Sequence, residues 1–323
     1  MRRSRGAGEP MLAVDPAPAP AFSRVDRSPR GLRLVAEAPP QGSATAPEAD
    51  LMLESGAPVP LRAAALVAGG TQVFGLSARA EVVYSLALPR IRVVHDRRPP
   101  GVDALVGAAS VNAGLLHAAD GWRVVVLPSL GDVAANLGDG PIALRADGRM
   151  LALIADGRLV ELPPGGAQEP ESRPGDADLL AYSGDGGLWV AVGAAVGPPG
   201  TARVAGSPVV ALSGASVAPR VAALHADGTV ALWQTGQEAP LARWRAPEDA
   251  AQTIRLSADG ERVELGCPAG DHPAACIARA SDGALVRRVV GARVLTATPD
   301  GGGALVAGDW GCAWLITIPD ATE

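Results

Sequence analysis

The sequence predicts an all-β protein, and three observations support that fold class. The chain holds 40 glycines and 29 prolines among 323 residues, so its apolar segments are short. The longest stretch without either residue has 13 residues, from Leu76 to Leu88, and isolated helices below about 12–15 residues are marginal. Nine Asp-Gly dipeptides separate the apolar segments, and this dipeptide is typical of tight hairpin turns because both residues tolerate a positive φ.

Composition and charge narrow the class of partner. Apolar residues form 48% of the chain, which is enough for a large core, but no run of 18 apolar residues predicts a membrane span. The formal charge is −6, and residues 1–30 hold six arginines against three acids while the rest of the chain is acidic. An acidic body argues against nucleic acid as the main partner, since phosphate binding needs a basic face. No apolar segment follows the basic start, so we expect a cytoplasmic protein.

The N-terminal part of the chain is predicted to hold one isolated strand. Residues 1–30 are expected to form a disordered tail, because Ala17-Pro18-Ala19-Pro20 is stiff and extended and lacks any apolar periodicity. Residues 31–38 alternate apolar and polar side chains, as a strand does. A Pro/Ser/Ala-rich linker follows at 39–49. The folded domain is therefore predicted to span residues 31–319, and its first strand needs a partner elsewhere.

A hairpin unit recurs along the rest of the chain. Residues 141–163 show it most clearly, with three short apolar strands joined by turns at Asp147-Gly148 and Asp156-Gly157. Corresponding first strands begin near Leu61, Ala104, Ile142, Leu179, Val209, Thr253 and Arg293. These starts are 30 to 44 residues apart, and four-stranded propeller blades take about 40–45 residues each. The sequence therefore predicts a single β-propeller.

Seven repeat starts predict seven four-stranded blades, although six blades also fit the spacing. The last unit, from Arg293 to Ile318, supplies only three strands. The strand predicted at residues 31–38 fits the vacant position. Closure of the ring by this strand would remove an exposed sheet edge.

Particular stretches resemble WD-repeat β-propellers. Leu256-Ser257-Ala258-Asp259-Gly260 and Thr298-Pro299-Asp300-Gly301 are similar to the first turn of that family's repeat. Asp227-Gly228-Thr229-Val230-Ala231-Leu232-Trp233 is similar to its third strand, with Gln234 where the family usually has aspartate. The resemblance covers residues 31–318, but the Gly-His and Trp-Asp dipeptides are absent. It implies a divergent WD-like propeller, in which the residues that usually form the family's hydrogen-bonded tetrad are not all matched.

The predicted propeller places all four histidines, and several other candidate binding residues, on one face. When strands a to d of each blade run from the axis outward, the b–c and d–a turns open on one face, here called the top face. The a–b and c–d turns open on the bottom face. Seven residues are predicted on the top face as candidate partner-binding residues: Arg79, His95, Arg97, His117, His225, His272 and Trp310. Trp310 is the candidate anchor, because Gly308-Asp309-Trp310-Gly311 places a large ring in a turn.

No catalytic residue, cofactor or metal site is predicted. His117 and His225 belong to blades on opposite sides of the ring, too far apart for one metal, and are interpreted as exposed turn residues. Only two asparagines occur, which disfavours a calcium site at the axis. No serine lies in a Gly-x-Ser-x-Gly turn. The chain contains no lysine, so no side-chain amine can act as base or nucleophile.

Cys267 and Cys276 bracket the predicted b–c loop of the sixth unit. Three alternatives stay open for this pair: two thiols, a disulfide across the loop, or a metal site completed by His272 and Asp271. Cys312 lies in an apolar strand and is interpreted as a small core residue.

Two functional hypotheses follow from these patterns. The favoured one is a non-enzymatic scaffold or adaptor whose top face binds a protein partner, partly by analogy with the family it resembles. The alternative is a propeller enzyme or a small-ligand sensor that uses the central channel. Fold alone does not decide between them.

Overall fold

The all-β prediction is confirmed in the computed structural model. It describes residues 22–28, 31–36, 48–50, 52–53, 61–68, 72–77, 82–84, 90–91, 102–127, 129–163, 170–204, 206–247, 251–267, 274–298, 303–308 and 313–318. Within these ranges the regular structure consists of strands, and no helix is long and apolar enough to cross a membrane.

Five four-stranded antiparallel sheets form the middle of the chain, and each uses four strands consecutive in sequence. The first two sheets contain β9 (Ala104–Gly107), β10 (Ala113–Ala118), β11 (Gly121–Val126), β12 (Gly131–Ala134); and β13 (Ile142–Leu144), β14 (Leu151–Ala155), β15 (Arg158–Leu162), β16 (Glu171–Pro174). The other three contain β17 (Leu179–Tyr182), β18 (Leu188–Val192), β19 (Ala195–Gly197), β20 (Arg203–Val204); β21 (Val209–Gly214), β22 (Arg220–His225), β23 (Thr229–Gln234), β24 (Ala242–Arg245); and β25 (Thr253–Leu256), β26 (Arg262–Cys267), β27 (Ala274–Arg279), β28 (Leu285–Val290).

Strands from the two ends of the described chain make up the remaining sheets. A three-stranded sheet contains β5 (Leu61–Val67), β6 (Gln72–Ser77) and β7 (Val82–Tyr84). A six-stranded sheet has the order β1 (Phe22–Ser28), β2 (Gly31–Ala36), β3 (Glu48–Asp50), β31 (Ala313–Thr317), β30 (Gly303–Gly308), β29 (Ala292–Ala297). The short strands β4 (Met52–Leu53) and β8 (Arg90–Ile91) pair in parallel.

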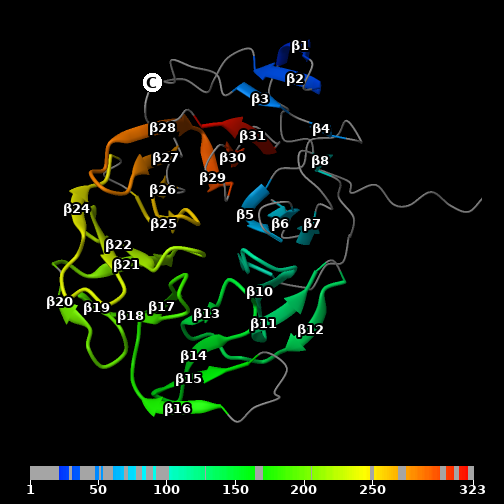
Figure 1. Ribbon diagram of the computed structural model, residues 1–323. Coiled ribbons are helices and arrows are strands. Elements are labelled where there is room, and N and C mark those ends of the chain that lie inside the picture. The colour runs from blue at the N-terminus through cyan, green and yellow to red at the C-terminus, as the bar shows by residue number, and fades with distance from the viewer. Residues whose placement is uncertain are drawn as a thin grey trace, which may run out of the picture.

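The sheets are arranged as a propeller around a common axis (Figure 1). In the five four-stranded sheets and in β5–β7 the first strand lies innermost, and in the six-stranded sheet β29 does. Strand β5 contacts both β9 and β29, and contacts also join β13 to β17, β17 to β21 and β21 to β25. The contact between β5 and β29 brings the two ends of the repeat array together, so the ring is closed.

The repeat starts read from the sequence are confirmed with one small shift. Six predicted first strands begin at the expected residue, and the strand expected at Arg293 begins at Ala292. The number of complete blades differs, because five four-stranded blades are present in the described residues where seven were expected. Within the described residues the β5–β7 sheet has three strands.

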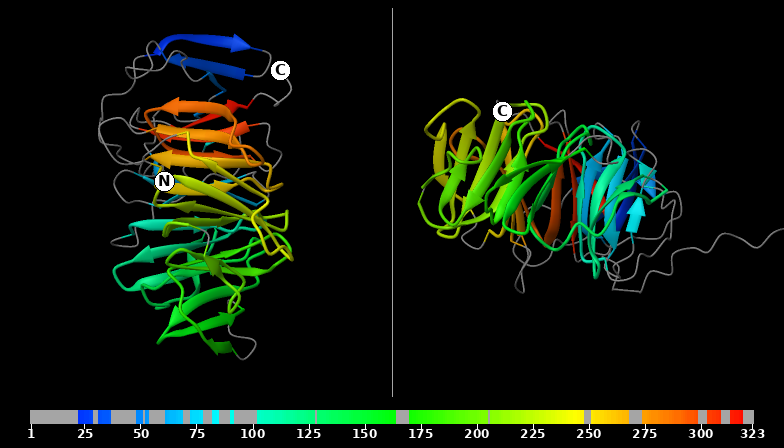
Figure 2. Two further views of the ribbon diagram at one scale, coloured as in Figure 1. Left: turned by 90° about the vertical axis from the view of Figure 1, so that its left-hand side faces the viewer. Right: turned by 90° about the horizontal axis from the view of Figure 1, so that it is seen from below.

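The last sheet is completed from the N-terminal side of the chain, but by a different strand from the one predicted. Strand β3 pairs with β31 through Ala49 opposite Ile316 and Asp50 opposite Leu315. Strand β2, which matches the strand predicted at 31–38, pairs with β3 one position farther out. Strand β1 lies inside the segment expected to be a tail and extends the sheet again. Figure 2 shows β1 and β2, in blue, beyond the orange and red strands.

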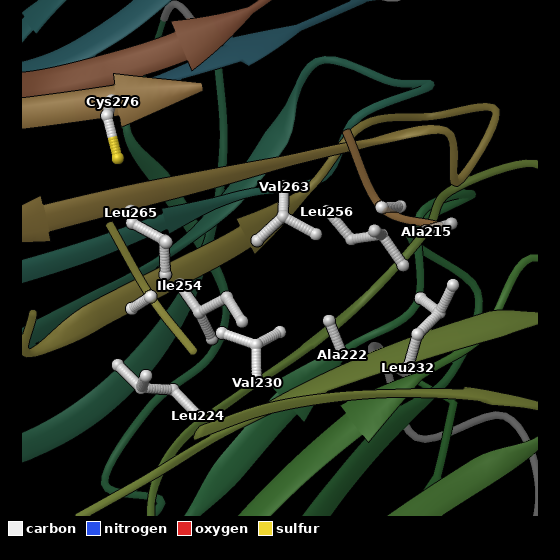
Figure 3. Close-up of a cluster of buried hydrophobic side chains, with 12 residues drawn as sticks. Ala215, Ala222, Leu224, Val230, Leu232, Ile254, Leu256, Val263, Leu265 and Cys276 are labelled. Atoms are coloured by element: carbon white, nitrogen blue, oxygen red, sulfur yellow. The ribbon is translucent and has the colours of Figure 1, made fainter. Parts of the chain in front are cut away.

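Apolar clusters fill the space between neighbouring sheets. Figure 3 shows the cluster between β21–β24 and β25–β28, where Leu224 and Val230 face Ile254 and Leu265. Trp189 and Trp233 pack between β17–β20 and β21–β24 with ring centroids 6.2 Å apart. Each of these sheets is therefore covered on both faces, as alternating strand residues require.

Backbone hydrogen bonds also join neighbouring a–b turns on the bottom face. Ser110 N donates to Ala146 O at 3.0 Å, Gly184 N to Ala218 O at 2.9 Å, and Ala218 N to Ala258 O at 3.0 Å. The inner strands approach so closely that a Cβ on Gly214 would lie 1.8 Å from the carbonyl oxygen of Tyr182. Only glycine fits at that position.

Closure of the last sheet by β3 leads to a truncation test. Removal of residues 1–36 takes away β1 and β2 but leaves β3 paired with β31. Removal of residues 1–50 also exposes the edge of β31. The second truncation should lower the free energy of unfolding by about 2 kcal/mol more than the first, at about 1 kcal/mol for each lost backbone hydrogen bond, and should promote aggregation. Chemical denaturation with light scattering measures both effects, and identical behaviour of the two truncations would contradict this closure.

Candidate functional site

His117 is the centre of a polar network on the top face. It lies near the end of β10, opposite Trp122 of β11, and the two rings are 4.8 Å apart. Its Nδ1 is 2.6 Å from Oδ1 of Asp103, and its Nε2 is 3.1 Å from Oδ1 of Asp139. Asp103 precedes β9 and Asp139 precedes β13, so the imidazole links its own sheet to the segment entering the next one.

The two carboxylates favour the charged form of His117. The hydrogen bond to Asp103 is the largest cause and raises the pKa of His117 above 6.5; Asp139 raises it further, and partial burial opposes both. The imidazolium can donate to both carboxylates at once, whereas the neutral ring has only one N–H. His117 is thus half-buried and paired, in contrast to the exposed turn residue that the sequence suggested.

His225 is a structural residue. Its side chain is 1% exposed, and its Nδ1 lies 2.6 Å from the carbonyl oxygen of Ser207. It ends β22 on the top face, as expected, but the sequence interpretation of an exposed histidine is wrong. The polypeptide that enters β21 covers the ring, and no feature of the turn sequence indicates that cover.

The other five predicted top-face residues, Arg79, His95, Arg97, His272 and Trp310, lie outside the described residues. Their grouping on one face stays a prediction. Of the seven residues, only His117 and His225 are placed by the structure, on the sheets β9–β12 and β21–β24.

Exposed aspartates are the prevailing feature of the described top face. They occur in b–c turns and in the segments that lead into first strands, across the sheets β9–β24. The exposed members are Asp103, Asp120, Asp139, Asp156, Asp176, Asp178 and Asp227. Some also order their own turns: Asp227 accepts the Thr229 N–H at 2.9 Å, and this hydrogen bond is the main reason that its pKa is lowered.

The bottom face uses its aspartates differently. In the turn after β25, Ser257 Oγ donates to Asp259 at 2.6 Å, and Asp259 accepts the N–H of Glu261. The turn after β17 repeats the pattern with Ser183 and Asp185, and Thr235 of the next sheet also donates to Asp185. These carboxylates stabilise turns and contacts between sheets.

Arg255 and Glu264 form a polar pair at the ring closure. They are opposite each other on β25 and β26, and they face the last sheet, since their neighbours Ile254 and Leu265 pack on the other side. Arg255 Nη1 donates to the carbonyl oxygen of Ala64 on β5 at 2.7 Å and to Thr296 Oγ1 on β29. One side chain therefore joins the inner strands of three sheets.

Glu264 is a buried acid with one engaged oxygen. It is 5% exposed, its Oε1 accepts the N–H of Ala297 at 2.5 Å, and its Oε2 has no hydrogen-bond partner. Burial raises the pKa of Glu264 to about 7, and the nearby Arg255 only partly opposes that shift. Neither residue is among those predicted from the sequence. Arg255 continues the ordinary polar/apolar alternation of Thr253-Ile254-Arg255-Leu256, so no sequence signal marked it.

The two cysteines of the sixth unit are not directly opposite each other. Cys267 pairs with Ala274, whereas Cys276 pairs with Leu265. Such diagonal neighbours are about 7–8 Å apart, beyond the usual Cα range of a disulfide. Cys276 is a buried thiol in the apolar cluster beside β21–β24. Of the three alternatives left open for this pair, the register favours two thiols over a disulfide. His272 and Asp271, the other proposed ligands, lie outside the described residues.

Neither metal chemistry nor sequence relationships define the site further. In the part of the chain that the structure describes, no group of three or more His, Cys, Asp or Glu side chains is placed to hold a metal ion. No protein-family model matches the chain, and no curated protein is significantly similar to it.

The His117 network predicts a specific change in titration. Asp103→Asn should lower the pKa of His117 toward 6.5, and by more than Asp139→Asn does, because Asp103 makes the shorter contact. Since the folded pKa is raised, this pair stabilises the fold below pH 6.5, and that stabilisation is lost as the pH rises through the folded value. NMR titration of the imidazole measures the pKa, with Asp156→Asn as control. An unchanged pKa in Asp103→Asn would contradict the network.

Glu264 predicts a second pH dependence. Its folded pKa of about 7 lies above the ordinary 4.5, so its contribution to stability is full below pH 4.5 and is lost as the pH rises through about 7. Glu264→Gln keeps an acceptor for Ala297 and removes the titration. The variant should therefore lose less stability than the wild type between about pH 5 and 8, by on the order of 2 kcal/mol. Urea denaturation across this range measures the difference, and parallel curves would refute the assignment.

Proposed function

We propose that the protein is a non-enzymatic scaffold whose top face binds a protein partner. The single observation that carries this proposal is the arc of exposed aspartates on the top face of the sheets β9–β24. The turns there project carboxylates from a rigid ring, and complementary charge steers association and selects partners. The partner surface that meets this arc is therefore basic.

The sequence adds a second part to the same surface. Arg79, Arg97 and Trp310 are assigned to the top face by the repeat pattern, on the units that flank the ring closure. We infer that they contact a second region of the partner, with the arginines on carboxylates and Trp310 as the anchor. Seven blades are part of the proposal, with the β5–β7 sheet and the last sheet as the first and seventh blades.

A divergent WD-like repeat is also part of the proposal. It is supported by the recurring Ser-x-Asp-Gly turns after β17 and β25 and by Trp233, which lies buried in the third strand of its sheet. Such repeats commonly build surfaces for protein partners, so this inference favours a scaffold by analogy. A small-ligand sensor is the second candidate, and Arg255 near the axis is the observation that favours it.

Matched charge reversals test the scaffold proposal. The double variant Asp139→Lys and Asp156→Lys reverses charge on the top face, and Glu238→Lys with Asp282→Lys does so in c–d turns of the bottom face. The top-face variant should slow association at least tenfold at low salt, while the bottom-face variant should leave it unchanged. Affinity capture with the tagged chain from native lysate identifies the partner, and biosensor kinetics measure the rates.

Trp310→Ala adds a test of the predicted anchor. It should weaken partner binding by about 2 kcal/mol, roughly thirtyfold, with the fold intact. Loss of binding only in the bottom-face variant would refute the proposal, as would a chain that captures no stoichiometric partner.

A further inference from the structure

The guanidinium of Arg255 lies at the axis of the propeller. Strand β5 is innermost in its sheet and pairs with β6 along one edge. The Ala64 carbonyl that accepts from Arg255 therefore points from the other edge, toward the axis. Thr296, the second acceptor, is on the innermost strand β29. Arg255 starts on β25, so its side chain must pass in front of β29 to reach β5.

Only one nitrogen of this guanidinium is engaged. Both contacts involve Nη1, and within the described residues Nε and Nη2 have no hydrogen-bond partner. The side chain is half-buried rather than fully enclosed. Two parallel N–H groups in this arrangement match a carboxylate, which accepts them as a pair.

The charge of Arg255 also lacks a full counter-charge nearby. The nearest acid on its side of the sheet is Glu264. Within the described residues, no nitrogen of Arg255 lies within 4.0 Å of a carboxylate oxygen of Glu264. Glu264 is partly protonated near neutral pH, since burial raises its pKa to about 7. A half-buried cation without a paired anion is costly, so an anionic ligand would stabilise it.

The innermost strands enclose a space, here called the axial channel, and these strands carry solvent-exposed apolar side chains. Val106 on β9 and Val210 on β21 are 43% and 44% exposed although both belong to innermost strands. Leu256 N donates to Ser213 Oγ at 3.1 Å, which sets β25 level with the end of β21. Val210 lies three residues before Ser213 and is therefore nearer the top face than Arg255.

We propose that the axial channel binds a short aliphatic carboxylate, with the carboxylate on Nε and Nη2 of Arg255 and the alkyl chain toward Val210. Access is from the top face. Thr296 and the Ala64 carbonyl hold the guanidinium in place through Nη1. The Nε–H and Nη2–H groups are therefore oriented before the ligand binds. The site is separate from the exposed aspartates of the proposed scaffold surface, so either proposal can fail alone.

Side-chain NMR of the intact chain tests the proposal without a variant. Butyrate at millimolar concentration should shift one arginine Nε–Hε resonance in a saturable way, and the neutral isostere butyramide should not. Arg255→Lys, which keeps the charge, assigns the resonance by its disappearance and should weaken butyrate binding at least tenfold. Thr296→Val, which removes one anchor, should weaken it less. The matched control is Arg158→Lys on the outer part of its sheet, which should bind butyrate as the wild type does.

Three results would overturn the proposal. The first is no saturable shift with butyrate. The second is an equal response to butyramide, which would remove the role of the charge. The third is equal saturation by inorganic phosphate, which would remove the carboxylate assignment. These three results come from unmodified protein, so they would overturn the proposal even if Arg255→Lys failed to fold. In that case the weaker butyrate binding of Thr296→Val carries the assignment to Arg255.

Discussion

Apolar packing between neighbouring sheets is the constraint on which the rest of the structure depends. A sheet of four short strands cannot bury both of its faces alone, and here each complete sheet packs against the next through residues such as Leu224, Val263 and Ile277. Each sheet needs a neighbour to cover its apolar faces, so this need is met for all sheets only when the ring is closed. Stability is thus a property of the ring, and closure carries more weight than any one repeat.

The closure itself combines two kinds of contact from distant parts of the sequence. Strand β3 supplies the outer strand of the last sheet through backbone pairing with β31. Arg255 supplies a side-chain link between β25 and β5 at the inner edge, across 191 residues of sequence. The two contacts lie at opposite edges of the same sheet. A half-buried arginine is an expensive way to make such a link unless its charge has a further use.

Sequence patterns within a hairpin predicted the strands well, whereas contacts between residues far apart in the sequence were not predicted. The Asp-Gly turns and apolar runs were sufficient to place first strands such as Leu61, Ile142 and Thr253 at the correct residue, because hairpin formation depends on neighbouring residues. The sequence does not show whether segment 31–38 or segment 48–50 pairs with β31. Both segments are short, and neither contains a residue that depends on its pairing partner. The burial of His225 and the partners of Arg255 depend on residues far along the chain. The same limit applies to the register that separates Cys267 from Cys276.

The hydrogen bonds between a–b turns make the two faces unequal. On the bottom face the described turns are tied to their neighbours through backbone atoms, as Gly184 is to Ala218 and Ala218 to Ala258. A substitution there disturbs two sheets at once. Top-face turns such as Asp156-Gly157 form within a single hairpin, Ala155 opposite Arg158. Substitutions in turns of this kind can therefore change the top face locally. Turns such as that at Gly193, whose carbonyl oxygen accepts the N–H of Val209 on the next sheet, cannot change without affecting a second sheet.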